Sequence, residues 1–147
     1  MTPEAQERYL VARGFLYGLG TSNVRHGTRT LDQHLVGTHL LLDAQAEREA
    51  VCLAGLFHSI YGTNVFMTCT LKADSQDDRD MVAHTIGHEA EALAYMFCML
   101  QGRPQCFFRS SEIAKPMTLA LSWRDLQAIE LANLIEQGGF SAVIRYL

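Results

Sequence analysis

Apolar residues recur at helical spacing along most of the chain, and strands are hardly indicated. Between residue 30 or 31 and about 46, Leu31, Leu35 and Leu42 fall on one face of an expected helix. The following segment, 47–60, is apolar nearly all round, which is typical of a helix at the centre of a bundle. Further helices are expected over 3–18, about 75–100 and 122–137, with a last short turn beyond residue 139.

Capping residues and glycines mark where these helices begin and end. Pro3 suits a first helical turn, and Ser75 can cap a helix whose first turn is acidic. Ser122 begins a capping pattern of the S-x-x-D type, whereas Gly87 interrupts or bends its helix and Gly138 ends the late one. Three stretches are expected to be loops: 25–30, 61–74 and 102–117. The pattern predicts an all-α fold, with one helical-bundle domain over residues 1–147.

Composition and charge narrow the class of protein. With 147 residues, 48% of them hydrophobic and 19% charged, the chain can bury a core and is not of a disordered type. A formal charge of −4 argues against nucleic-acid binding through a basic surface. No apolar run reaches the roughly 18–20 residues of a membrane span, and early charged residues argue against a signal peptide. We expect a cytoplasmic protein that binds neither nucleic acid nor a membrane, and the sequence leaves a homo-oligomer open.

The cysteines and histidines are the residues with metal-binding chemistry. No C-x-x-C spacing relates the four cysteines, so no zinc knuckle is predicted and all four thiols are expected to be free. His34 and His58 lie on consecutive helices that a short connection makes antiparallel neighbours, so both imidazoles can point at one site. A lone histidine on an apolar face is more often a core residue. A facing pair favours a metal site, because imidazole is the commonest metal ligand.

The segment TLDQHLVGTHLLLDAQAEREAVCLAGLFHSIYGT resembles the core of the HD superfamily of metal-dependent phosphohydrolases. In that superfamily a histidine on one helix is followed by a His-Asp pair that closes the next. The hydrolase domain of the RelA/SpoT alarmone enzymes is similar over a longer range, since GHEAEAL matches their G-E-E-V-A-E-L segment and IELANLIEQ matches their I-K-L-A-D-R-L-H-N helix. The chain is more similar again to an uncharacterised HD-like family with a G-L-F-H-S-x-Y-G-T signature, which the segment AGLFHSIYGT matches nearly verbatim. The resemblance covers about residues 30–137 and implies an HD-type helical domain.

The resemblance implies metal ligands and also shows that the site has changed. His34 and His58 match two metal ligands of the HD enzymes. Asn133 matches the position of a late metal-binding Asp, and Ser59 stands where the Asp of the His-Asp pair is expected. Neutral oxygens are weaker ligands than carboxylates for Mn or Fe. Glu130 lies one turn before Asn133 on the same helical face and could supply a carboxylate.

The positions implied to contact a nucleotide have also changed in part. Gly62 and Thr63 replace an acidic pair that helps to activate water in the alarmone hydrolases. We therefore expect at most weak hydrolysis of guanosine tetraphosphate. Gln137 falls at the position of a polar nucleotide contact, and Arg25 and Arg29 precede the first histidine as basic residues do in that family. These two arginines either meet an anionic ligand or are surface residues.

A site without a metal could use some of the same residues. A pocket with a base, two hydroxyl groups and a phenol would be lined by His58, Ser59, Tyr61 and Thr63. In the simpler interpretation, the Ser59 hydroxyl donates to the backbone carbonyl one turn earlier and has no chemical role. His26, in the loop that enters the second helix, could also reach a site near His34.

Two functions follow from these patterns. The first is an HD-like enzyme that acts on a small polar or phosphorylated metabolite by hydrolysis, with divalent Mn, Fe or Zn as cofactor. Its candidate catalytic residues are His34, His58, Ser59, Tyr61 and Glu130, and its candidate metal ligands are His34, His58 and Asn133. Its candidate ligand-binding residues are Arg25, Arg29, Thr63 and Gln137. The second function is a catalytically inactive HD-like domain that binds a nucleotide-like small molecule or a protein partner.

Overall fold

The computed structural model describes residues 1–62, 71–108 and 122–145. Their helices form the all-α, single-domain fold that the sequence predicts, together with one short hairpin that it does not. The elements in chain order are α1 (Pro3–Gly18), η1 (Thr21–Asn23), β1 (Arg25–His26), β2 (Arg29–Thr30), α2 (Leu31–Ala44), α3 (Glu49–Leu56), α4 (Gln76–Ile86), α5 (His88–Met99), α6 (Gln105–Phe108), α7 (Trp123–Gly138) and α8 (Phe140–Ile144). Within the described ranges, none of the helices has the length and apolar character needed to cross a bilayer.

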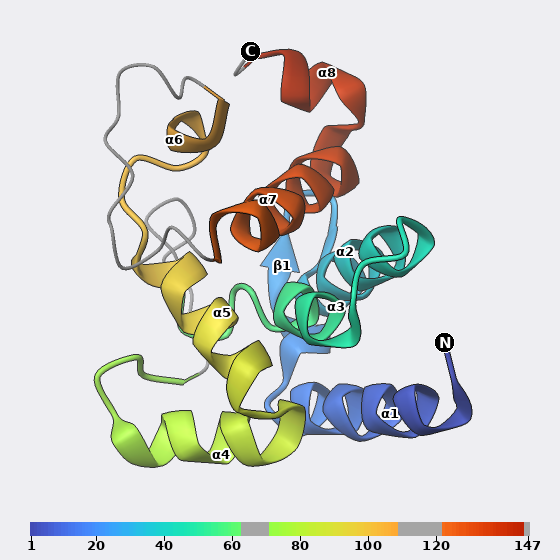
Figure 1. Ribbon diagram of the computed structural model, residues 1–147, viewed down its shortest axis with the longest axis vertical. Helices are drawn as coiled ribbons and strands as arrows, with labels where there is room; N and C mark the ends of the chain where they lie inside the picture. Colours follow the sequence, from blue (N-terminus) through green and yellow to red (C-terminus); the bar gives the residue numbers. More distant parts are fainter. Residues whose placement is uncertain (63–70, 109–121, 146–147) are drawn as a thin grey trace.

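The central helices are α2 and α3, and the other elements surround them. Figure 1 shows α1 and α4 side by side at one end of the molecule, with α5 above α4 and α7 above α2 and α3. Helix α2 contacts both α3 and α7, and α3 also contacts α5. Every residue from 51 to 62 is buried, as the apolar pattern of this segment predicts. Residues near the end of α3 therefore lie in the middle of the bundle.

The predicted helix boundaries are confirmed where a local capping signal sets them. Thr30 and Gln33 form a capping box: the Thr30 hydroxyl accepts from the Gln33 N–H, and the Gln33 side chain accepts from the Thr30 N–H. Ser75 caps α4 by accepting from the N–H of Asp78 at 3.2 Å. Gly87 separates α4 from α5 with a φ of 90°, a backbone conformation that favours glycine.

Three local expectations are corrected by tertiary contacts. Residues 25–30 form the β1–β2 hairpin and not a loop, with Gly27 at a φ of 62°. Helix α3 ends at Leu56, four residues before the predicted end, and continues as turns. Ser122 makes no side-chain capping bond. The carboxylate of Asp125, which the S-x-x-D pattern would turn back toward Ser122, is instead held by Arg48 at 2.7 and 2.9 Å.

The predicted loop 102–117 contains a buried helical turn. Cys106 and Phe107 of α6 are buried, and the Phe107 ring lies 4.9 Å from the ring of Trp123. The rest of that predicted loop, from residue 109, lies outside the described residues. Cys52 and Cys106 are free thiols, and Cys69 lies outside the described part of the chain.

Candidate active site

Two buried imidazoles meet at the centre of the bundle. His34 of α2 and His58, just beyond α3, are 1% and 2% exposed. Their rings meet edge to face with centroids 5.1 Å apart, and the two Nε2 atoms are separated by 3.2 Å. The structure thus places the two histidines that sequence spacing singled out in direct contact.

The hydrogen bonds of the other ring nitrogens determine what lies between the two Nε2 atoms. The Nδ1–H of His58 donates to the carbonyl of Gly55 at 2.7 Å, and a carbonyl can only accept. The Nδ1 of His34 contacts the carboxylate of Glu136, which is also an acceptor when ionised. If both rings are neutral, each Nε2 therefore carries a lone pair, and the two lone pairs face each other. Such a pair is stable only with a proton or a cation between the nitrogens.

Glu136 of α7 reaches His34 because α2 has a glycine where the two helices approach. A Cβ atom at Gly37 would lie 2.6–2.9 Å from the carboxylate and stem atoms of Glu136, which is too close. The carboxylate also pairs with Arg29 of β2, whose guanidinium donates to the Glu136 backbone carbonyl at 3.0 Å. The hairpin and α7 together therefore fix the carboxylate that orients His34.

A second group of polar side chains continues from the pair toward the surface. The ring of His26 in β1 stacks on that of His34 with centroids 4.2 Å apart. Gln137 lies 3.5 Å from the His26 Nε2 and donates to the Asn133 side-chain carbonyl at 3.0 Å. Asn133 in turn donates to Glu130 at 3.3 Å. All five residues of this chain are named in the sequence analysis, four as candidates and His26 as able to reach the site, and the structure brings them together through α2, α7 and the hairpin.

Glu130 forms an ion pair with Arg103, an arginine that no sequence pattern singles out. The Arg103 guanidinium donates to the Glu130 carboxylate at 2.6 Å, and both side chains are at most 2% exposed. The same guanidinium lies over the Phe97 ring, 3.6 Å from its centroid, and Phe97 also contacts the edge of His58. Arg103 lies in a stretch expected to be a loop, and such a stretch carries no periodic signal of burial.

Burial lowers the pKa values of two histidines in the site, His58 and His26. Removal from water holds the pKa of His58 well below its usual value of 6.5, and the neighbouring His34 and Arg103 lower it further. Burial also lowers the pKa of His26, with a smaller contribution from His34. His58 is therefore a neutral imidazole with an available lone pair at ordinary pH.

The remaining candidates lie elsewhere or make no bond to the pair. Tyr61 donates its hydroxyl to Glu91 at 3.0 Å, in a cluster that also contains Arg79. Ser59 is buried, and in the part of the chain that is described its hydroxyl makes no hydrogen bond to the carbonyl one turn earlier. Arg25 is exposed on β1, and Thr63 lies outside the described residues.

Metal-binding capacity at the site rests on the imidazole pair. Across residues 1–62, 71–108 and 122–145, no group of three or more His, Cys, Asp or Glu side chains is arranged to hold a metal. His84 and His88, which share metal-like i, i+4 spacing in the sequence, are exposed on two different helices. A cation at His34 and His58 would therefore need further ligands from water or from a bound anion.

Comparison with known proteins assigns the chain to a family. Residues 15–102 match a family model described as a domain of unknown function, DUF6817. The chain belongs to this family. The matched range contains α2, α3 and α5, and therefore His34, His58 and Phe97. Helix α7, which carries Glu136, lies beyond the matched range. We find no significant match among curated proteins or solved structures.

Proposed function

We propose that this DUF6817 protein is an HD-like hydrolase in which His34 and His58 hold a divalent cation used to cleave a small phosphorylated metabolite. The approach of the two Nε2 atoms to 3.2 Å carries the proposal. Metal–imidazole bonds of about 2.0–2.1 Å from one cation can span this separation. Both rings also have their Nδ1 held by an acceptor, as metal-ligating histidines do.

The resemblance of residues 30–137 to the HD phosphohydrolases supports the same assignment. In such a site a bound divalent cation supplies a nucleophilic hydroxide and polarises the phosphoryl oxygen. Glu136 orients the ring of His34 by accepting its Nδ1–H. Arg29 is partly exposed beside this carboxylate, and Gln137 is exposed at the end of the polar chain. These two side chains therefore lie where an incoming phosphate could be bound and oriented.

The missing carboxylates favour an anionic substrate. Two neutral imidazoles leave the charge of a divalent cation uncompensated, and a phosphoryl group supplies both negative charge and oxygen ligands. The Mn²⁺, Fe²⁺ or Zn²⁺ class of cation fits imidazole better than Mg²⁺ does. We therefore place the phosphoryl oxygens of the substrate in the positions that carboxylate ligands occupy in the related enzymes.

A second function is favoured by the engagement of Glu130 and Asn133. Glu130 is neutralised by Arg103, and both ends of the Asn133 amide are hydrogen-bonded. A domain with these side chains committed to one another could bind a small ligand beside Arg29 and Gln137 without cleaving it. We rank this inactive ligand-binding domain second.

Calorimetry with Mn²⁺ alone tests the first proposal. The purified protein should bind Mn²⁺ with a stoichiometry near one, and His58→Ala should abolish binding. The matched control is His84→Ala, which removes an exposed histidine and should leave binding unchanged. Phosphate release from a panel of nucleotides and sugar phosphates, with and without Mn²⁺, then tests turnover. Saturable ligand binding without metal binding or release would replace the hydrolase by the inactive domain.

Restoring the lost carboxylates gives a complementary test. The pair Ser59→Asp and Asn133→Asp should raise Mn²⁺ affinity by about tenfold or more, since even indirect changes around a metal alter affinity roughly 10–100-fold. Without metal the same variant should be less stable, because Asn133→Asp removes a donor to Glu130 and adds a second carboxylate beside it. Adding His58→Ala should cancel the gain in affinity. Unchanged Mn²⁺ affinity in a folded double variant would contradict the metal site.

A further inference from the structure

The outer face of α1 carries large apolar side chains that the fold leaves exposed. Leu10, Val11 and Tyr17 are 59%, 57% and 72% exposed. Successive residues of a helix are about 100° apart, so all three side chains lie within about 60° of Gly14 around the helix. Scattered exposed apolar residues are ordinary on a protein surface, whereas three on one helical face form a patch of the kind that marks an interaction surface.

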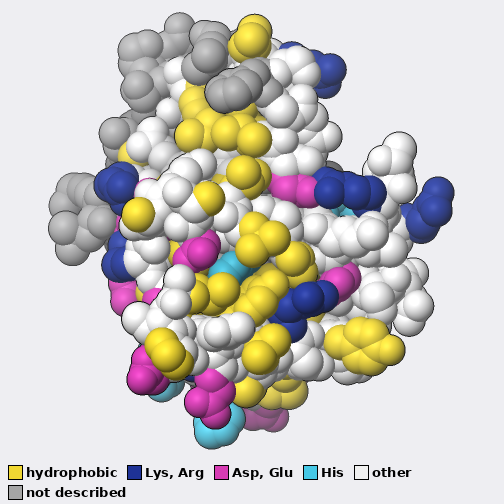
Figure 2. Space-filling model, turned by 90° about the vertical axis from the view of Figure 1, so that its right-hand side faces the viewer, with side chains coloured by type: hydrophobic (Ala, Val, Ile, Leu, Met, Phe, Trp, Pro, Cys, Tyr) yellow, Lys and Arg dark blue, Asp and Glu magenta, His cyan; other side chains and the backbone are white. Residues whose placement is uncertain are grey.

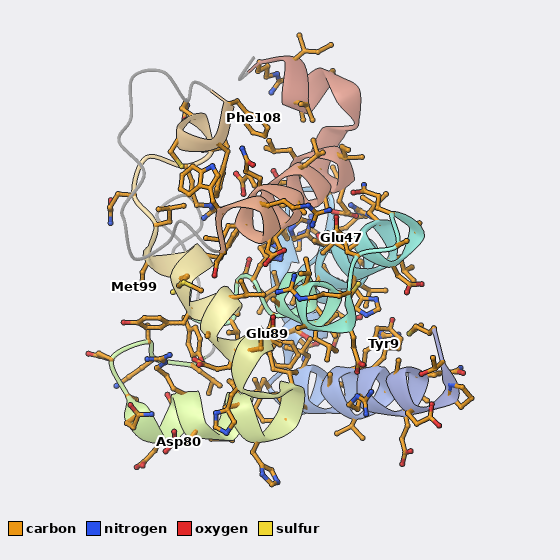
Figure 3. The ribbon with its side chains drawn as sticks, in the orientation of Figure 1. Tyr9, Glu47, Asp80, Glu89, Met99 and Phe108 are labelled. Atoms are coloured by element: carbon orange, nitrogen blue, oxygen red, sulfur yellow. The ribbon has the colours of Figure 1, made fainter. Side chains whose placement is uncertain are left out.

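The opposite face of α1 is the one that packs on the core. Ala12 and Leu16 are fully buried and lie about 160° around the helix from Gly14. Figure 3 labels Tyr9 on the side of α1 that faces α2 and α3, where its ring packs on His39 with centroids 4.4 Å apart. Helix α1 runs along the lower edge of the molecule in Figure 1, and Figure 2 shows hydrophobic side chains at the surface toward the same end. The patch therefore points away from the bundle.

Two glycines leave open space between the apolar side chains of this face. A Cβ atom at Gly14 or Gly18 would meet nothing within 4 Å. Neither glycine has a positive φ, so the backbone does not require glycine at these positions. Glycine inside a helix is destabilising relative to alanine, and what Gly14 provides here is room. A side chain of a second helix can therefore approach the α1 backbone closely at this point.

The order of residues along the face makes it complementary to a second copy of itself. In an antiparallel pair of α1 helices with a two-fold axis at residue 12, Leu10 of each copy would lie opposite Gly14 of the other and fill the open space there. The same axis would place the exposed Glu7 opposite Tyr17, because both pairs have residue 12 as their midpoint. Each Tyr17 hydroxyl could then donate to a Glu7 carboxylate. A parallel pair would instead bring the two Glu7 carboxylates together.

A second helix is a better occupant of this face than a lipid surface. Glu7 lies on the face and Glu4 beside it, and the chain has a formal charge of −4, so anionic headgroups would be repelled. The residues along the centre of the face follow one another at alternating steps of four and three, at positions 3, 7, 10, 14 and 17. This spacing is typical of the contact line between two packed helices.

We propose that the outer face of α1 is a self-association surface, through which two copies of the chain form an antiparallel α1–α1 dimer. Helix α1 has 16 residues and is therefore about 24 Å long. A single helix pair of this length lies at the small end of specific interfaces, so the dimer is weak and dissociates readily. The surface points away from the core that holds the histidine pair, and the dimer is thus independent of the proposed metal chemistry.

Analytical ultracentrifugation of the whole chain, from about 10 µM to about 1 mM, tests the dimer. The average mass should rise with concentration from that of one chain toward that of two. Leu10→Gln should raise the dissociation constant about tenfold or more, because it removes from both copies the apolar side chain that fills the space at Gly14. The matched control is Leu40→Gln, which replaces a leucine of α2 that is 50% exposed and should leave the dissociation constant unchanged.

An exchange of charges tests the antiparallel orientation. Tyr17→Glu places two carboxylates opposite each other in both halves of the dimer and should weaken it. Adding Glu7→Lys restores opposite charges across an antiparallel pair and should recover roughly fivefold or more in affinity, whereas a parallel pair would keep like charges together. Melting curves check that each variant is folded. A mass of one chain at every concentration, equal dissociation constants for the two leucine variants, or no recovery in the double variant would overturn the proposal.

Discussion

The burial of His39 should make the protein sensitive to acid in a way that one substitution can isolate. The pKa of His39 falls from 6.5 to about 4 because the ring is removed from water. A folded-state pKa below the unfolded one means that the unfolded chain binds the proton first. The stabilisation is therefore fully present above about pH 6.5 and is lost as the pH falls toward 4.

The size of the effect follows from the two pKa values. Between about pH 7.5 and pH 5, the unfolded His39 becomes almost fully protonated, whereas the folded residue stays largely neutral. Linkage then gives a loss of about 2 kcal/mol in the free energy of unfolding over this interval. His39→Gln has no group that titrates here, so this part of the acid sensitivity should disappear.

Urea unfolding followed by circular dichroism at the two pH values measures the difference. The fixed cost of replacing His39 cancels, because the compared quantity is the loss of stability between the two pH values. The unmodified protein should lose about 2 kcal/mol more than His39→Gln does. His84→Gln, which replaces an exposed histidine, should behave like the unmodified protein. Equal losses in the unmodified protein and His39→Gln would refute the burial argument.

Three further predictions concern the histidine site. Arg103→Met leaves the buried Glu130 without its charged partner and should lower the free energy of unfolding by about 3–5 kcal/mol. The loss should be smaller when Glu130→Gln is added, and urea unfolding of the unmodified protein and these two variants checks this. Gly37→Ala places a methyl group against Glu136 and should weaken Mn²⁺ binding by roughly tenfold in calorimetry, whereas Gly14→Ala, which meets open space, should not. Guanosine tetraphosphate should be hydrolysed at most weakly with Mn²⁺ in a chromatographic assay, because the acidic pair of the alarmone hydrolases is absent; robust turnover would contradict the importance given to that pair.

The helices could be predicted from the sequence because their signals are local. The start of α2 depends on a capping box within four residues, and the break between α4 and α5 depends on one glycine with a positive φ. The meeting of His34 and His58 also follows from a short connection between two amphipathic segments. These features need only backbone propensity and the spacing of apolar residues.

The partners of the histidines depended on the tertiary structure. Glu130 lies three residues before Asn133 and Glu136 lies three residues after it, so the spacing alone supports either carboxylate as a partner of the histidines. The rotation of α7 against α2, together with the space at Gly37, directs Glu136 to His34 and Glu130 to Arg103. The periodicity of apolar residues predicts which residues share a helical face. It does not predict how that face is oriented toward a distant helix, or that an arginine in a loop is buried, because both depend on contacts between residues far apart in the chain.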